Sequence, residues 1–183
     1  MKDKILDMAA NKIQIHGLKK FTIDEIARDL KISKKTIYKY FSSKDEIVEE
    51  FFKTIVKSDK ENMESSLKRQ NNFMSKIHCI VYSNHKYKLP INLINEAKIY
   101  YPKEWNKIQE LKQYKLNAIK ELLKEGVSSG IIKQDINLPI LTKMLEQTVD
   151  IFLDYDFLMD NKMKFSEAIQ EVLKIILYGI STK

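Results

Sequence analysis

Residues that break helices are scarce in this chain, which has only 4 glycines and 3 prolines among its 183 residues. Tight β-hairpin turns need glycine or another residue that tolerates positive φ, so this scarcity leaves little material for a sheet. Long runs rich in Lys, Glu, Leu and Ile, with apolar residues at helical spacing, fill the intervals. The sequence therefore predicts an all-α protein of about nine helices.

The formal net charge of +7 favours a polyanionic partner such as nucleic acid. The single cysteine, Cys79, cannot form an intramolecular disulfide, which fits a reducing compartment. No apolar stretch approaches the roughly 20 residues that span a membrane. The N-terminal sequence MKDKILDMAANKIQIHG carries charges within its apolar runs, unlike a signal peptide. We therefore expect a cytoplasmic protein with no membrane contact and no cofactor.

Three helix signals follow one another near the N-terminus. Apolar residues recur at helical spacing over about residues 4–15, and Gly17 can end that helix in a left-handed conformation. Thr22, followed three residues later by Glu25, forms a capping box that opens a helix of two turns with one apolar face. Ser33 is the next N-cap candidate. Two short helices separated by so tight a turn predict a helix-turn-helix motif.

The second of these helices should run from Lys34 to about Phe41. At about 100° per residue, Ile37 and Phe41 fall together and define its buried direction. The polar side chains that point away from them are Lys35, Thr36 and Lys39 opposite, and Tyr38 and Tyr40 on the flanks. A helix of this diameter fits the DNA major groove, so the central residues would reach base edges and the tyrosines would lie near phosphates. The alternative is a solvated, lysine-rich surface helix.

At these residues the sequence resembles the tetracycline-repressor-type (TetR) family of bacterial transcription regulators. The matching runs are FTIDEIA at 21–27 and ISKKTIYKYFSSKDEI at 32–47. The family often has glycine where Lys31 stands, so that turn would be shaped differently or strained. It often has Gly or Ala at Lys35, where a lysine offers a longer reach.

The resemblance implies that Lys34, Lys35, Thr36 and Lys39 face the DNA groove. It implies that Tyr38, Tyr40 and Lys44 contact phosphates and that Thr22 anchors the first helix of the motif to the DNA backbone. Together with the helical projection, it gives these DNA-binding residues: Thr22, Ser33, Lys34, Lys35, Thr36, Tyr38, Lys39, Tyr40 and Lys44. It also implies two domains. Residues 1–47 would form the helix-turn-helix DNA-binding domain, and residues 48–183 a helical regulatory domain for ligand binding and dimerisation.

Further helix signals mark the regulatory part of the chain. Ser43 and Glu46 form a second capping box, which opens the fourth helix. Prolines at 90, 102 and 139 look like first-turn residues. The remaining helices are expected within 72–87, at about 91–100 and 103–127, from 139, and from about 166.

The last helix is apolar on two sides, so one face should pack inward and the other against a second copy of the chain. The predicted dimer residues on the eighth and ninth helices are Phe152, Ile169, Val172, Leu173, Ile176 and Ile180. The resemblance implies the same arrangement, a four-helix bundle made by two copies of the last two helices. The alternative is a fully buried final helix in a monomer.

The TetR resemblance also implies a small-molecule pocket enclosed by helices 5 to 8. The candidate lining residues are polar groups on mostly apolar faces: Tyr82, Asn95, Tyr114, Thr148 and Tyr155. Each could instead be an ordinary core or surface residue. A metal site built from His78, Cys79 and His85 is conceivable, but i, i+7 is a poor chelating spacing and no carboxylate cluster is adjacent, so we expect no metal.

The predicted function is a homodimeric transcriptional regulator, a repressor that a small-molecule ligand releases from a palindromic operator. The alternative is an architectural DNA-binding protein with the same head and no inducer. An enzyme is not expected, because the chain has no nucleophile–base pattern, glycine-rich phosphate loop or metal-binding spacing.

Overall fold

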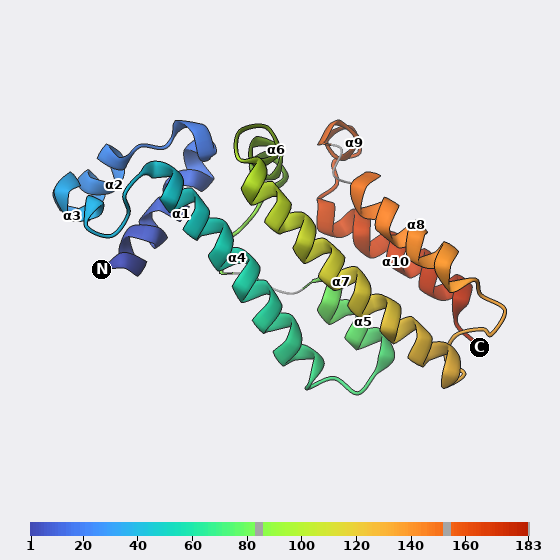
Figure 1. Cartoon of the computed structure of the whole chain (residues 1–183). Helices are drawn as coiled ribbons and strands as arrows, with labels where there is room; N and C mark the ends of the chain where they lie inside the picture. The colour runs from blue at the N-terminus through green and yellow to red at the C-terminus, as the bar shows by residue number, and fades with distance from the viewer. Residues whose placement is uncertain (83–85, 152–154, 183) are drawn as a thin grey trace. The chain divides into compact units, whose positions relative to one another are not determined.

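The structure is a computed structural model that describes residues 1–82, 86–151 and 155–182; the side chains at 149–151 and 155 are not described. The described part is all-α, as predicted, and contains one helix more than the nine expected (Figure 1). Its helices are α1 (Lys2–Lys20), α2 (Ile23–Leu30), α3 (Lys34–Tyr38), α4 (Lys44–Leu67), α5 (Phe73–Val81), α6 (Ile91–Tyr100), α7 (Pro102–Ser128), α8 (Leu138–Ile151), α9 (Tyr155–Asp160) and α10 (Phe165–Ile180). The unexpected element is α9, which is too short for periodicity to reveal.

The chain forms two compact units. The first contains residues 1–62 and 84–111, and the second contains residues 63–83 and 112–183. The first unit thus combines the predicted DNA-binding head with α6. The functional division predicted at residue 47 stays a prediction.

Helix α1 is longer than the predicted residues 4–15, because the chain leaves the helical conformation at Gly17 and then forms one more helical turn. Gly17 supplies that break with φ 83° and ψ 169°, a backbone conformation that favours glycine. Five apolar side chains of α1 before the break are buried in the core of this unit: Ile5, Leu6, Ala9, Ala10 and Ile13. The helix therefore forms the base on which α2 and α3 pack.

The turn between α2 and α3 has the left-handed conformation that the missing glycine would have favoured. Lys31 adopts φ 54° and ψ 42°. The Ile32 amide bonds to the Ala27 carbonyl at 3.0 Å and the Lys31 amide to the Arg28 carbonyl at 3.1 Å, so the end of α2 is satisfied. A non-glycine residue there costs about 1–2 kcal/mol, so the turn is strained and not reshaped.

The start of α4 differs from the predicted capping box. The Ser43 hydroxyl accepts the Glu46 amide at 3.1 Å, as a cap should. The Glu46 carboxylate, however, accepts the amide and hydroxyl of Ser42 at 2.5 and 2.6 Å, one residue earlier than expected. These bonds lower the pKa of Glu46. They hold the turn that joins α3 to α4.

Of the three predicted first-turn prolines, Pro90 alone lies outside its helix. Pro102 is the first residue of α7, as predicted. Pro90 instead lies before α6 as its N-cap. Pro139 is the second residue of α8, where the Asn137 side chain accepts the Ile140 amide at 3.1 Å and caps the helix.

The second unit is built around apolar residues of α5, α7, α8 and α10. Its core includes Ile77, Leu123, Leu145 and Leu173. The end of α10 pairs with the loop after α7: the Lys133 amide bonds to the Ile180 carbonyl and the Thr182 amide to the Ile131 carbonyl, both at 3.0 Å. This short antiparallel bridge fixes the end of α10 on the unit's own core.

Candidate nucleic-acid interface

The second helix of the motif is anchored by two apolar side chains. Ile37 and Phe41 are both buried in the core of the first unit, as predicted. The regular part of α3 ends at Tyr38, before the predicted Phe41. The amides of Tyr40 and Phe41 still bond to the Ile37 carbonyl at 2.9 and 3.1 Å, so the helical turn continues to the second anchor. The predicted division into inner and outer faces is therefore kept.

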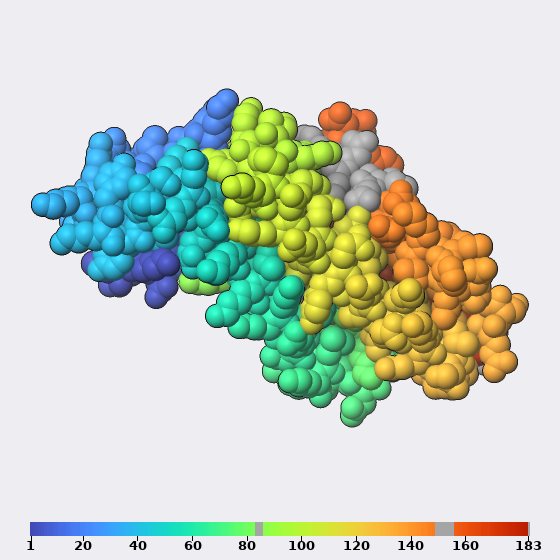
Figure 2. Space-filling view, in the orientation of Figure 1, coloured from blue at the N-terminus to red at the C-terminus, as the bar shows by residue number. Residues whose placement is uncertain are grey.

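The opposite face of this turn is basic and phenolic. Lys35 and Lys39 are exposed, Thr36 is half-buried, and Tyr38 and Tyr40 are 51% and 41% exposed. Within the described residues, neither Lys35 nor Lys39 has an ion-pair partner in the chain. The space-filling view shows this light-blue and cyan segment at the surface (Figure 2). Two free ammonium groups between two phenol hydroxyls can contact phosphates and base edges.

The start of α3 is occupied by hydrogen bonds within the motif. The Ser33 hydroxyl accepts the Thr36 amide at 3.1 Å and lies 2.9 Å from the Thr36 hydroxyl. The Lys34 ammonium pairs with Asp24 of α2 at 2.5 Å, and both side chains are exposed. The expectation that Ser33 and Lys34 contact DNA stays a prediction, and both residues have an internal partner as well.

The predicted capping box at Thr22 is present. The Thr22 hydroxyl accepts the Glu25 amide at 3.2 Å, while the Thr22 amide and hydroxyl both donate to the Glu25 carboxylate at 2.9 Å. These two donors lower the pKa of Glu25. The contact of Thr22 with the DNA backbone stays a prediction. Its hydroxyl proton is already donated to Glu25 within the protein.

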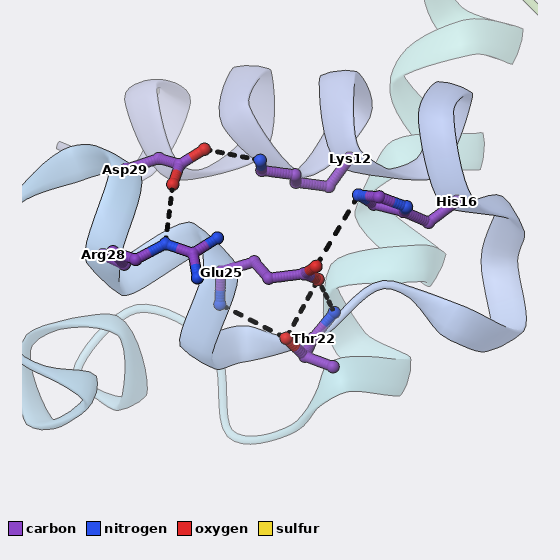
Figure 3. A network of polar contacts seen from close by, with 6 residues as sticks. All are labelled: Lys12, His16, Thr22, Glu25, Arg28 and Asp29. Carbon is purple, nitrogen blue, oxygen red and sulfur yellow. Dashed lines mark hydrogen bonds and ion pairs between the residues drawn. The ribbon is translucent and has the colours of Figure 1, made fainter.

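An ion pair and a histidine–carboxylate contact join α2 to α1 beside that cap (Figure 3). The Lys12 ammonium lies 2.5 Å from Asp29, which also receives a hydrogen bond from Arg28 at 3.3 Å. The His16 ring lies 3.6 Å from Glu25. The two donors to Asp29 lower its pKa. Helices α1 and α2 are therefore joined by charge as well as by apolar packing.

Lys44 has an internal partner that the sequence did not reveal. Its ammonium donates to the Lys19 carbonyl at 2.6 Å and lies 4.4 Å from the centre of the Phe21 ring. Burial lowers the pKa of Lys44. The predicted phosphate contact stays a prediction.

The candidate ligand residues do not gather in one place. Asn95 is exposed on α6, the Tyr114 hydroxyl donates to Glu64 at 2.6 Å, and the Thr148 hydroxyl returns to the Met144 carbonyl at 2.8 Å. Tyr155 has no described side chain. Tyr82 lines a cavity of the second unit.

That cavity is a groove of about 360 Å³ between α5 and α10. Its apolar lining is Met74, Ile77, Leu173 and Leu177. Polar groups at its edge include His78, Tyr82 and Lys174. The Tyr82 hydroxyl donates to the Ser166 carbonyl at 3.3 Å. No acidic residue lines the groove, and its volume is within the range of small-molecule sites.

The predicted dimer residues lie mostly in the chain's own core. Ile169, Leu173 and Ile180 are buried within the second unit, so they have little surface left for a partner. Val172 and Ile176 are half-buried, and Phe152 lies outside the described residues. The prediction that these three side chains face a second copy is therefore corrected: they form the inward stripe of α10, which packs on its own chain.

Helices α8 and α10 are adjacent (Figure 1), and each carries exposed apolar side chains outside the inward stripe. They are Ile175 and Tyr178 on α10, and Ile140 and Met144 on α8. Ile175 and Tyr178 lie on the second of the two apolar sides expected of the last helix. The sequence does not reveal which side is outermost, because periodicity does not say which stripe finds a partner within the chain.

Among the described residues, no three His, Cys, Asp or Glu side chains come close enough to hold a metal ion. His85, one of the ligands considered, lies outside those residues. No helix in the described ranges is long and apolar enough to cross a membrane.

The motif, its capped helices and its basic face define a helix-turn-helix DNA-binding domain. Residues 5–51 match the family model described as "Bacterial regulatory proteins, tetR family". The resemblance to TetR regulators is therefore confirmed, and this chain carries their type of DNA-binding domain.

Curated relatives extend the similarity along the chain. It is 26% identical to the "Fatty acid metabolism regulator protein" of Bacillus subtilis, covering 98% of this chain and 95% of that protein. It is 29% identical to an uncharacterized HTH-type transcriptional regulator, YhgD, of the same organism, covering 98% and 96%. Both relatives are named as regulators.

Solved structures share the fold. A transcriptional regulator from Saccharomonospora viridis in complex with choline has a TM-score of 0.79 at 17% identity, covering 100% of this chain and 98% of that one. The regulator FadR from Bacillus subtilis in complex with stearoyl-CoA has a TM-score of 0.64 at 22% identity, covering 98% and 100%.

Proposed function

We propose that this chain is a homodimeric transcriptional repressor that binds a palindromic DNA operator and releases it when a small molecule binds. The observation that carries the DNA-binding part is the outer face of α3. Lys35, Tyr38, Lys39 and Tyr40 are exposed there while Ile37 and Phe41 hold the helix from behind. A single short helix reads few base pairs, so a specific site needs two heads about one turn of DNA apart.

The exposed apolar residues of α8 and α10 support the second copy. Large apolar side chains at Ile140, Met144, Ile175 and Tyr178 are open to water in a single chain. A second copy covering the same faces by two-fold symmetry would bury them and would pair the two heads. The inward stripe of α10 is already used, so the bundle would form through the outer faces.

The groove between α5 and α10 supports a ligand with an apolar chain and an acidic or acceptor head group. Its lining includes the aliphatic Ile77, Leu173 and Leu177. His78 adds a ring nitrogen, and Lys174 adds a cation that pairs with Glu171 at 2.6 Å and would have to exchange that partner for the ligand. A regulator with a similar fold has been solved in complex with stearoyl-CoA. A relative that matches this chain over nearly its whole length is named a fatty acid metabolism regulator protein. A ligand that prefers the released geometry would shift the protein away from DNA.

The test of the DNA-binding proposal is selection of random double-stranded DNA by the purified protein, followed by sequencing. We expect one motif with two-fold symmetry, preferred over random DNA by several kcal/mol. Binding without any motif would contradict the repressor and favour the architectural protein. Both should lose affinity steeply with salt, so salt dependence alone does not distinguish them.

The ligand proposal is tested with stearoyl-CoA as the probe and coenzyme A as its control. We expect the acylated compound alone to raise the melting temperature and to release the selected operator. Met74→Trp should fill the groove and abolish both effects, whereas Met159→Trp, at another exposed methionine, on α9 and outside the groove lining, should not. An unchanged response in Met74→Trp would contradict the groove as the site.

A further inference from the structure

We propose that Glu96 of α6 is a positioning residue for DNA binding, because its carboxylate holds the last turn of α1 in the place that the DNA-binding face requires. This role rests on the proposed function. The helix break at Gly17 leaves the amides that follow it without helical partners. Glu96 accepts two of them in one carboxylate oxygen: Leu18 at 2.7 Å and Lys19 at 3.3 Å.

The two sides of this contact are fitted to each other. A Cβ atom added at Gly17 would lie 2.4 Å from Glu96 Oε1 and 2.9 Å from Oε2. Only a residue without a side chain allows the carboxylate to come so close to the backbone. The glycine therefore provides both the positive φ and the space that Glu96 occupies.

A second residue of α6 contacts the same turn. The Lys19 ammonium lies 4.5 Å from the centre of the Tyr100 ring, one helical turn beyond Glu96. Helix α6 thus contacts the end of α1 through a carboxylate on the backbone and an aromatic ring on the side chain. Both helices belong to the first unit.

The turn that Glu96 holds leads directly to the motif. Its Lys19 carbonyl accepts the ammonium of Lys44, the first residue of α4. Phe21, which follows the turn, is fully buried, and Thr22 caps α2. Losing the Glu96 contact would therefore shift the start of α2 and the start of α4 together, on both sides of the recognition helix.

Because Glu96 is negatively charged, a positioning role and simple charge repulsion predict opposite effects of its removal on DNA binding. A carboxylate repels DNA, so removing it should tighten binding if charge were all that mattered. A positioning role predicts the opposite sign for substitutions that lose the hydrogen bonds. It also predicts that the bonds, and not the charge, decide the result.

The experiment compares four variants on the selected operator by fluorescence anisotropy, with the melting temperature measured alongside. Glu96→Ala removes the acceptor, and Glu96→Asp keeps the charge but shortens the side chain by one methylene. Glu96→Gln keeps an acceptor oxygen without the charge. Glu61→Ala removes an exposed carboxylate of α4 that pairs with Lys57 across one helical turn, and it is the charge control.

We expect Glu96→Ala and Glu96→Asp to weaken operator binding about tenfold, the size of one or two lost charged hydrogen bonds. Glu96→Gln should bind like the wild type, and Glu61→Ala should bind equally well or more tightly. If Glu96→Ala fails to fold, the comparison of Asp with Gln carries the same distinction.

Wild-type affinity in both Glu96→Ala and Glu96→Asp would overturn the positioning role while leaving the proposed function intact. Equal weakening of Glu96→Gln and Glu96→Asp would also overturn it, because the acceptor would then not be what matters. Failure of the wild type to bind any DNA would overturn the proposed function, and the positioning role with it.

Discussion

The ammonium of Lys44 donates to the main-chain carbonyl of Lys19, with 2.6 Å between nitrogen and oxygen. Lys19 stands in the last turn of α1 and Lys44 is the first residue of α4, so one side chain joins the two ends of the helix-turn-helix motif. A lysine expected to reach a DNA phosphate also stabilises the fold that presents the DNA-binding face.

Lys44→Met should lower the free energy of unfolding by about 1–2 kcal/mol, because the Lys19 carbonyl loses a charged donor. Urea denaturation followed by circular dichroism measures this difference. Lys53→Met is the control, since that exposed lysine on the same helix makes a long ion pair with Glu50 at 3.9 Å. Weaker DNA binding in Lys44→Met with unchanged stability would mean that Lys44 acts on phosphate alone.

Gly17→Ala should destabilise the first unit by more than about 1–2 kcal/mol, the cost of a positive φ for a side-chain-bearing residue. The excess comes from the 2.4 Å approach of the new Cβ to Glu96. Gly130→Ala is a matched control, because Gly130 also has a positive φ of 74° but nothing within 4 Å of the added Cβ. Equal losses in the two variants would show that the Glu96 carboxylate moves aside without cost.

Lys39→Ala should relax base preference, whereas Tyr38→Phe should weaken binding to all sequences alike. The reason is that Lys39 lies on the outward side of the motif and Tyr38 on its flank, toward phosphate. Selection from random DNA, repeated with each variant, measures both effects. A changed consensus with Tyr38→Phe would mean that the two faces are assigned the wrong way round.

Asp7→Asn should lower stability at neutral pH, and the difference from wild type should shrink as the pH falls below about 4. The hydrogen bond from Lys86, assisted by the Tyr87 hydroxyl, outweighs burial and lowers the pKa of Asp7. A carboxyl whose folded pKa is lowered stabilises the protein above its unfolded pKa, and the contribution is lost as the pH falls through the folded value. Melting temperatures across that range test this, with Asp3→Asn on the same helix as the control. A pH-independent difference would argue against ionisation as the cause.

Ile175→Lys should convert the dimer to a monomer, because a charge would enter the apolar face of α10. Ile99→Lys is the control: Ile99 is 68% exposed and Ile175 72%, but Ile99 belongs to α6, which is not one of the two helices of the proposed bundle. Sedimentation velocity gives the oligomeric state of both. A dimer that survives Ile175→Lys would place the interface elsewhere.

Most of the fold could be predicted from local signals. Scarce glycine and proline excluded a sheet-based fold, and the cap at Thr22 and the buried pair Ile37 and Phe41 are confirmed. These features depend on residues at most four positions apart, which helical geometry brings together. The short α9 and the Ser42 contact of Glu46 were missed, because a one-turn helix and a shifted cap leave no periodic trace.

The sequence by itself determined the helical class, the helix-turn-helix motif and the basic outer face of α3, because helical spacing alone sets which side chains share a face. Only the tertiary structure decided the partners of that motif. Glu96 and Gly17 are 79 positions apart, and no local pattern relates them. The same holds for α10, whose two apolar sides look alike in sequence. Packing against the chain's own core buries one and leaves the other exposed.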